Sequence, residues 1–202
     1  GGLLSSQKKK LQFFLQLAQE IPMATSTAAL KHVVVTGANS GIGLALCKRI
    51  VTEKSCYAYL GSRDKGRGEA ALASIVSAFP EVAGKIEVLV IDVNDDASVA
   101  AAADSLKARN VKLYAVVNNA GVGLAHGDLG GAEPIIETNY RGPKRVTAAF
   151  IDLIEPSEGR VVNTSSGVAS MWLRNQDEAT RALFSNPNLS QAELDAAIQN
   201  EM

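Results

Sequence analysis

The stretch Thr36–Gly43, with the sequence TGANSGIG, decides how this 202-residue chain folds. It directly follows the β-branched run Lys31–Thr36 (KHVVVT), which is typical of a buried strand. It directly precedes Leu44–Glu53, where apolar residues recur at helical spacing. A glycine-rich turn between a strand and a helix is the setting in which a dinucleotide binds, because the helix N-terminus offers free N–H groups and a partial positive charge to a phosphate.

The glycines of this turn have separate expected roles. Gly37 permits the tight turn, Gly41 lets the backbone approach a pyrophosphate, and Gly43 allows the helix to pack closely on the strand. The alternative is a glycine-rich helix entry that binds no ligand. Because the flanking strand and helix favour the first interpretation, we predict a cofactor site formed by Gly37, Asn39, Ser40, Gly41, Ile42 and Gly43.

The rest of the chain alternates short apolar runs with helical patterns. Further strands are expected at Cys56–Gly61, Lys85–Ile91, Leu113–Asn118 and Arg160–Thr164. Helices are expected at Gly68–Phe79, Asp95–Ala108 and Glu133–Ile154, the last interrupted at Gly142–Pro143. Regular alternation with continuous apolar strands predicts a parallel sheet covered by helices on both faces, which is a doubly wound α/β fold of the Rossmann type.

Composition excludes several other classes of protein. The chain has 20 Lys and Arg against 21 Asp and Glu, and this near-neutral balance argues against a nucleic-acid or membrane partner. No apolar run reaches the ~18 residues that would cross a bilayer. Cys47 and Cys56 form no CxxC pair and indicate reduced thiols in a cytoplasmic protein. His and Cys residues lack metal-ligand spacing, so no metal is expected.

Residues 1–29 precede the first predicted strand and form an N-terminal extension. The preferred interpretation is that 1–22 is artefactual or dispensable and that the extension is disordered. A targeting peptide and an amphipathic helix are the two alternatives, because Lys8–Lys10 precedes the apolar run LQFFLQLA. Met23 then begins a sequence that is ordinary for the start of a soluble enzyme.

The pattern TGxxxGxG, together with Asn118-Asn119-Ala120-Gly121 after the fourth strand, resembles the short-chain dehydrogenase/reductase family. The resemblance implies that Asp92, with Val93 beside it, approaches the adenine of a nicotinamide cofactor. It also implies that Asn118, Ala120 and Gly121 support the sheet and the cofactor. Taken alone, Asp92 would be an ordinary cap at a helix entry.

The end of the second strand determines which cofactor is expected. An enzyme that selects NAD places an acidic residue there to bind the ribose 2′-hydroxyl. Here the chain has neutral Ser62 and then Arg63, whose guanidinium suits a 2′-phosphate. Such charge-assisted hydrogen bonds contribute about 1.5–3 kcal/mol each, so we predict NADP(H). In the alternatives, Asp64 pairs with Arg63, or Arg63 is a solvated surface residue.

Two catalytic residues follow from the same resemblance. The segment 138–142 (TNYRG) resembles the family's TNxxG, whose asparagine holds a water of the proton relay, and this role falls to Asn139. The segment 163–166 (NTSS) resembles the family's NxSS, whose last serine binds the substrate carbonyl, and this role falls to Ser166. Ser165 is expected to be a packing or capping residue.

The family's reaction also needs a YxxxK pair after this serine, to protonate the carbonyl and bind the nicotinamide ribose. No Tyr follows Ser166, and the last lysine of the sequence is Lys144. The literal match Tyr140–Lys144 comes before Ser166 and overlaps TNxxG, so we predict that it is not the catalytic pair.

The segment Met171–Met202 resembles the helical insertion of the family's monomeric carbonyl-reductase branch, which reduces small carbonyl compounds with NADPH. Within it, Ser190 and Glu193 have the spacing of a capping box. We therefore expect a Rossmann domain at 30–170, the start of the insertion at 171–202, and a parent protein that is monomeric when intact.

The predicted sheet is then incomplete at its C-terminal edge, where the fifth strand is exposed. The resemblance implies a piece of an NADPH-dependent carbonyl reductase without the catalytic Tyr and Lys. The alternative is a non-catalytic NADP-binding module that serves as a sensor or scaffold.

Overall fold

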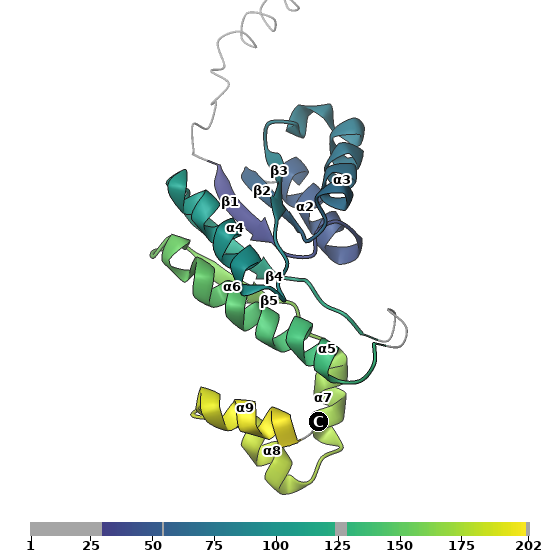
Figure 1. Ribbon diagram of the computed structural model, residues 1–202, viewed down its shortest axis with the longest axis vertical. Helices are drawn as coiled ribbons and strands as arrows, with labels where there is room; N and C mark the ends of the chain where they lie inside the picture. Colours follow the sequence, from purple (N-terminus) through teal and green to yellow (C-terminus); the bar gives the residue numbers. More distant parts are fainter. Residues whose placement is uncertain (1–29, 54, 124–128, 201–202) are drawn as a thin grey trace, which may run out of the picture.

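A computed structural model describes residues 30–53, 55–123 and 129–200 (Figure 1), so the predicted N-terminal extension lies outside the described residues. Its centre is one parallel sheet with strand order β3-β2-β1-β4-β5. The strands are β1 (Lys31–Val35), β2 (Cys56–Ser62), β3 (Ile86–Val90), β4 (Leu113–Asn118) and β5 (Arg160–Asn163). The predicted doubly wound α/β fold is confirmed, and each strand ends within two residues of its predicted bounds.

Helices cover both faces of the sheet (Figure 1). On one face, α2 (Gly41–Glu53) and α3 (Lys65–Ala78) pack against Val33 and Val35 of β1. On the other face, α4 (Asp96–Ala108) and α6 (Gly142–Phe150) pack against Val34. Because neighbouring residues of a strand point to opposite faces, the continuous apolar run of β1 serves two separate core clusters. The short helix η1 (Pro80–Val82) follows α3.

The expected interruption at Gly142–Pro143 is wrong, because the helical stretch runs on from residue 133 to residue 153. It consists of α5 (Glu133–Ile136), the π-helical turn η3 (Glu137–Arg141), α6 and η4 (Ile151–Leu153). The Gly142 N–H donates to the Glu137 carbonyl, five residues back. This wider turn places Pro143 in the first turn of α6, where its missing N–H and fixed φ are tolerated.

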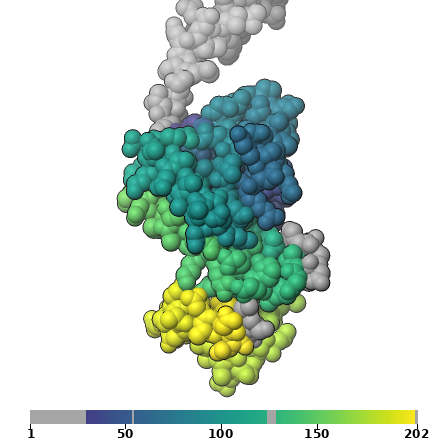
Figure 2. All heavy atoms as spheres, viewed as in Figure 1, coloured from purple at the N-terminus to yellow at the C-terminus, as the bar shows by residue number. Residues whose placement is uncertain are grey.

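The last part of the described chain leaves the sheet. After β5 come α7 (Gly167–Arg174), α8 (Glu178–Phe184) and α9 (Gln191–Asn200), which form a lobe below the α5–α6 stretch (Figures 1 and 2). Of their described residues only Ala197 is buried. The predicted capping box is confirmed, since the Ser190 N–H donates to Glu193 Oε2 at 2.8 Å and the Glu193 N–H donates to Ser190 Oγ at 3.3 Å. The predicted domain boundary at 170 falls inside α7.

Candidate functional site

The glycine turn between β1 and α2 has the geometry that its sequence predicts. Gly37 and Gly41 have φ values of +62° and +56°, a region that favours glycine. A Cβ on Gly37 would lie 2.7 Å from Ala120 Cα, whereas a Cβ on Gly41 would meet nothing within 4 Å. Ile42 is 73% exposed at the start of α2. The turn is therefore closed on the protein side and open at the helix N-terminus, which fits a pyrophosphate.

Asn119 holds this turn in place and is absent from the predicted site. Its Nδ2 donates to the Thr36 carbonyl at 2.9 Å and to the Gly37 carbonyl at 3.3 Å. Thr36 Oγ1 in turn accepts the N–H groups of Asn119 and Ala120, both at 3.0 Å. A Cβ on Gly43 would lie 2.5 Å from Asn119 Nδ2, so Gly43 makes room for this asparagine. The second Asn of the NNAG segment was the available sequence signal.

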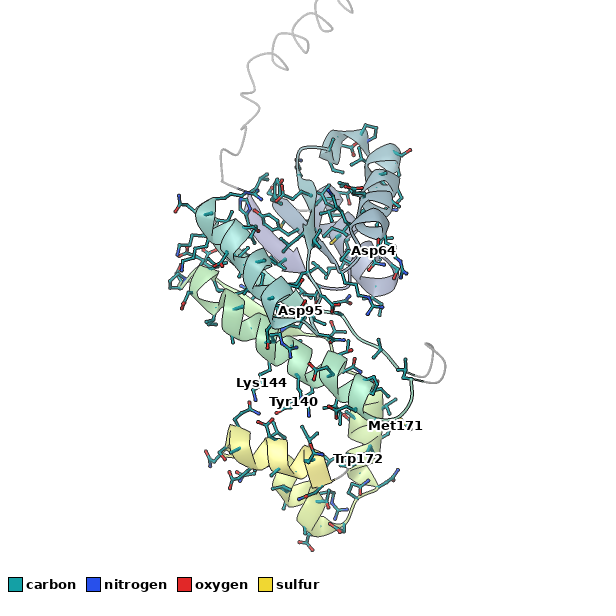
Figure 3. All side chains as sticks on the ribbon, in the orientation of Figure 1. Asp64, Asp95, Tyr140, Lys144, Met171 and Trp172 are labelled. Atoms are coloured by element: carbon teal, nitrogen blue, oxygen red, sulfur yellow. The ribbon has the colours of Figure 1, made fainter. Side chains whose placement is uncertain are left out.

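The end of β2 is followed by an arginine that pairs with no acid in the described part of the chain. Ser62 is buried, and its hydroxyl donates to the Asp64 carbonyl at 2.7 Å. The Asp64 carboxylate accepts the Arg67 N–H at 2.7 Å and caps α3 (Figure 3). The alternative Asp64–Arg63 pair is therefore wrong. Arg63 is exposed, and it forms no ion pair with any residue that the structure describes. Arg67, also exposed, adds a second cation at this edge.

Polar groups of the loop after β3 form hydrogen bonds within the loop and with the first turn of α4. Asp92 Oδ1 accepts the Asn94 N–H at 3.0 Å, and the Asp92 N–H donates to Ser98 Oγ at 2.9 Å. Asp95 caps α4 by accepting two backbone N–H groups. Val93, between them, is buried. These hydrogen bonds stabilise the loop at the carboxyl edge of the sheet, and the adenine contacts of Asp92 and Val93 stay predictions.

The ends of β4 and β5 are joined side by side. Asn118 Nδ2 donates to Asn163 Oδ1 at 2.8 Å, and the Thr164 N–H donates to the Asn118 carbonyl at 3.0 Å. Ser166 follows, exposed, at the same edge of the sheet as the glycine turn. Its Oγ accepts the Val168 N–H at 3.2 Å, so Ser166 caps α7 and the capping alternative for Ser165 does not hold for this helix.

Asn139 faces the segment that follows β4. Its Oδ1 accepts the Val122 N–H and its Nδ2 donates to the Val122 carbonyl, both at 2.8 Å. A Cβ on Gly121 would lie 3.3 Å from the same Oδ1. Asn139 therefore fixes the backbone just beyond Ala120 and Gly121. Its role in a proton relay stays a prediction.

Tyr140 and Lys144 point toward α9 (Figure 3). The Tyr140 hydroxyl donates to Asp195 Oδ1 at 2.8 Å, and Lys144 Nζ lies 3.0 Å from Asp195 Oδ2. Burial, and then the bond to Asp195, raises the pKa of Tyr140. A tyrosine that donates a proton near neutral pH needs a lowered pKa, so this environment is the opposite of a catalytic one. The pair connects α9 to the helical stretch above it.

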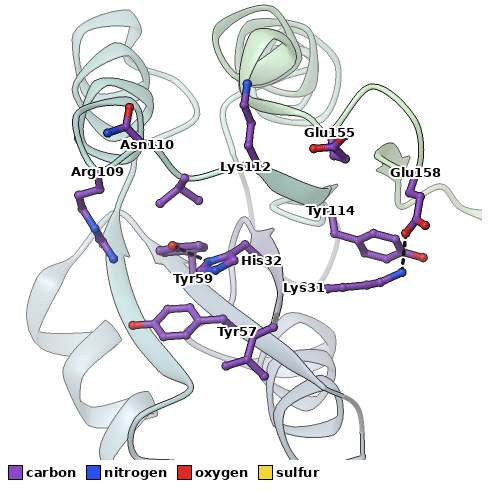
Figure 4. Close-up of a pocket in the computed structure, with 12 residues that line it drawn as sticks. Lys31, His32, Tyr57, Tyr59, Arg109, Asn110, Lys112, Tyr114, Glu155 and Glu158 are labelled. Carbon is purple, nitrogen blue, oxygen red and sulfur yellow. Dashed lines mark hydrogen bonds and ion pairs between the residues drawn. The ribbon is translucent and has the colours of Figure 1, made fainter. Parts of the chain in front are cut away.

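A cavity of about 600 Å³ lies at the amino edge of the sheet, away from the glycine turn (Figure 4). His32, Tyr57 and Tyr59 form its aromatic floor, with the His32 ring stacked 5.2 Å from Tyr57. Several of its polar groups already pair within the protein. His32 Nδ1 lies 2.9 Å from the Tyr59 hydroxyl, Tyr57 donates to Glu87, and Lys31 pairs with Glu158. Sequence reasoning did not anticipate this cavity.

Burial also decides the chemistry of the thiols. Cys47 and Cys56 are both buried, and burial raises the pKa of the Cys47 thiol to about 12, which makes it unreactive. Within the described ranges, no three His, Cys, Asp or Glu side chains are grouped to hold a metal ion. None of the described helices has the length and apolar character needed to cross a membrane.

A parallel sheet with a glycine turn at its first βα junction defines a nucleotide-binding protein of the doubly wound class. The profile described as short chain dehydrogenase matches residues 31–176. The chain therefore belongs to the short-chain dehydrogenase family of oxidoreductases.

Individual relatives agree with this assignment. The (+)-neomenthol dehydrogenase of Arabidopsis thaliana is 31% identical over 83% of this chain and 64% of its own length. Carbonyl reductase [NADPH] 1 of Bos taurus is 31% identical over 80% of this chain and 58% of its own length. The solved menthone neomenthol reductase of Mentha piperita has 31% identity and a TM-score of 0.76, over 86% of this chain and 73% of that one. The chain spans about three fifths of the two curated relatives.

Proposed function

We propose that this chain forms the cofactor-binding part of an NADPH-dependent oxidoreductase that reduces a carbonyl group of a small molecule to an alcohol. The observation that carries the proposal is the open glycine turn at Gly41 together with Arg63 at the end of the neighbouring strand, which is exposed and pairs with no acid among the described residues. The relative from Bos taurus, whose name includes NADPH and carbonyl reductase, supports the same choice of cofactor and reaction.

Each part of the cofactor has expected partners along the carboxyl edge. The N-terminus of α2 would hold the pyrophosphate, and Arg63, with Arg67 nearby, would hold the 2′-phosphate. Asp92 and Val93 would face the adenine, and Asn118, Ala120 and Gly121 would support the nucleotide. NADPH, when bound, supplies a hydride.

The remaining expected roles concern the substrate. Ser166 would donate a hydrogen bond to its carbonyl oxygen, and Asn139 would hold the water of a proton relay. We further propose a cytoplasmic protein that is a monomer when its parent is intact, in keeping with the buried thiols.

A second candidate is a non-catalytic NADP-binding module. It is favoured by the engagement of Tyr140 and Lys144 with Asp195, because these two residues form the YxxxK match of the given sequence and are bound away from a catalytic role. Both candidates predict that these 202 residues bind NADPH without turning over a ketone. They differ in whether turnover appears once a chain extended beyond residue 202 supplies a YxxxK pair.

A fluorescence titration with NADPH and with NADH tests the shared prediction. We expect saturable binding of NADPH, at least about tenfold tighter than NADH, because one charge-assisted hydrogen bond contributes about 1.5–3 kcal/mol. Arg63→Ala should remove this preference. The control Arg49→Ala, which removes an exposed arginine paired with Glu53 on α2, should keep it. Equal affinity for both cofactors in the unmodified chain would refute the assignment of NADPH.

A further inference from the structure

One side chain from α6 reaches across to the loop that follows β3. The Arg145 Nη1 donates to the Val93 carbonyl at 2.5 Å, and its Nε pairs with Asp96 at the start of α4. Its Nη2 lies 2.8 Å from Glu137 Oε1 on its own helical stretch. The Arg145 side chain is only 20% exposed. A single guanidinium thus connects the loop, α4 and η3.

Two other contacts join the same helical stretch to the same loop. Asn94 Nδ2 donates to Thr138 Oγ1 at 3.0 Å, and Thr138 is buried. Gly142 lies against Val93, because a Cβ on it would be 3.1 Å from Val93 Cγ2. The helical stretch therefore holds the loop at three points. These are the side chain of Asn94, the backbone carbonyl of Val93, and the van der Waals contact between Val93 and Gly142.

The helical stretch also holds the other predicted cofactor segment. Asn139, next to Thr138, fixes the backbone of Val122 through two hydrogen bonds. Thr138 and Arg145 thus support the loop after β3, and Asn139 supports the segment after β4. These two loops flank the place where the proposed function puts the adenosine part of the cofactor.

Arginine suits this position for a physical reason. Its planar guanidinium stays charged and offers several donors in a fixed arrangement, so it can bind a carbonyl and two carboxylates together. Lysine offers a single ammonium on a shorter reach and cannot reproduce that pattern. Without Arg145 the partly buried Val93 carbonyl loses its side-chain donor, and the loop gains freedom.

We propose that Arg145 is a positioning residue for the adenosine half of the cofactor, acting through the carbonyl of Val93. This inference rests on the proposed function, but it concerns a residue on the far side of the loop from the expected ligand. It assigns Arg145 no contact with the cofactor or the substrate.

The test uses the full 202-residue chain and two probes, NADPH and 2′,5′-ADP, the latter representing the adenosine half alone. Arg145→Gln should weaken both probes by a similar factor, about tenfold, as expected for the loss of one charge-assisted hydrogen bond. Arg145→Lys should give an intermediate loss, and it decides the question if the glutamine variant does not fold. Among the described residues, the matched control Arg141→Gln removes ion pairs with Glu133 and Glu137, and it should bind both probes normally.

Hydrogen exchange separates positioning from general destabilisation. In Arg145→Gln, amides 92–98 should exchange faster, while those of α2 keep the protection of the unmodified chain. Faster exchange throughout the molecule, or unchanged affinity for 2′,5′-ADP in the Arg145 variants, would overturn the inference. If the unmodified chain binds neither probe, the proposed function itself fails, which is a distinguishable result.

Discussion

Val117 of β4 and Val162 of β5 are paired neighbours in one sheet, yet Val117 is 7% exposed and Val162 is 42% exposed. The difference comes from their surroundings, because β4 lies between two strands and under helices on both faces, while β5 is an edge. The same contrast separates a first region, β1 to α6, from a second region, β5 to α9. The first has two buried core clusters, whereas Ala197 is the single buried residue among the described residues of the second.

The contrast locates the proposed function within the molecule. The residues of the proposed cofactor site belong to the first region. They lie at the carboxyl ends of its buried strands, which hold them in place. The second region contributes Ser166 and joins the first where β5 pairs with β4, while its helix α9 touches the first through polar contacts such as those of Asp195. Surface contacts of this kind add little stability, so we expect the two regions to respond differently to substitution.

The largest expected effect comes from the core of the first region. Leu60→Ala should lower the free energy of unfolding by about 2–5 kcal/mol, because Leu60 is fully buried between β1 and β3 and its removal leaves a cavity. Leu183→Ala makes the same change at a residue of α8 that is 38% exposed, and should cost less than about 0.5 kcal/mol. Urea unfolding of both variants measures the difference. Similar losses of unfolding free energy in the two variants would contradict the proposed difference in packing between the two regions.

The next effect concerns the glycine turn. Gly43→Ala puts a methyl group 2.5 Å from Asn119 Nδ2 and 2.7 Å from the Gly37 carbonyl. We expect a loss of about 1–3 kcal/mol in stability from overpacking, together with loss of NADPH binding, measured by thermal melting and titration. Gly84→Ala is the control, since a Cβ there meets nothing within 4 Å. Normal NADPH binding by Gly43→Ala would contradict the assigned role of the turn.

The contrast between regions also explains what could be read from the sequence. The strands of the first region follow from their runs of apolar residues, and the glycine turn follows from its glycine spacing. Arg63 and Asp95 could also be predicted from the local sequence. Arg63 is a charged residue directly after a strand, and Asp95 is a capping residue directly before a helix. The family resemblance gave Asn139 and Ser166, whose catalytic roles stay predictions.

What the sequence did not reveal depends on contacts between distant residues. Asn119 bonds to Thr36, 83 positions away, and Arg145 bonds to Val93, 52 positions away. The helix continues past Pro143 because of a π-helical turn, which no local sequence pattern predicts. Asp195 likewise meets Tyr140 only because α9 folds back, 55 positions along the chain.

Acidity should act on the two regions in different pH ranges. Burial, and then the nearby Arg109, lowers the pKa of His32 below its usual 6.5. The unfolded chain therefore binds a proton more readily than the folded one, and stability falls as the pH drops below about 6.5. His32→Gln should flatten the stability curve between pH 7 and pH 5, measured by urea unfolding.

Asp195 provides the contrasting case. Its bonds to Tyr140 and then Lys144 lower its pKa from 3.8, so the contact of α9 persists above that value and is lost as the pH falls through the folded-state pKa. Exchange of the α9 amides should stay constant from pH 7 to pH 5 after correction for intrinsic rates. A rise there in step with the His32 transition would show that the regions are coupled.

The smallest expected effect is confined to the second region. Asp195→Asn weakens the contacts with Tyr140 and Lys144 and should speed hydrogen exchange in α9, while global stability and NADPH affinity stay unchanged. Glu178→Gln, which neutralises an acid in the first turn of α8, is the matched control and should leave α9 unchanged. A marked fall in NADPH affinity in Asp195→Asn would mean that the second region shapes the cofactor site.

The most direct test of the account is hydrogen exchange of the full chain with and without saturating NADPH. The account predicts added protection at the carboxyl edge of the sheet, in residues 36–43, 92–94 and 118–122, and little change at the amino-edge cavity or in α8 and α9. Protection concentrated at that cavity or in those helices, or no protection by NADPH of a folded chain, would contradict it.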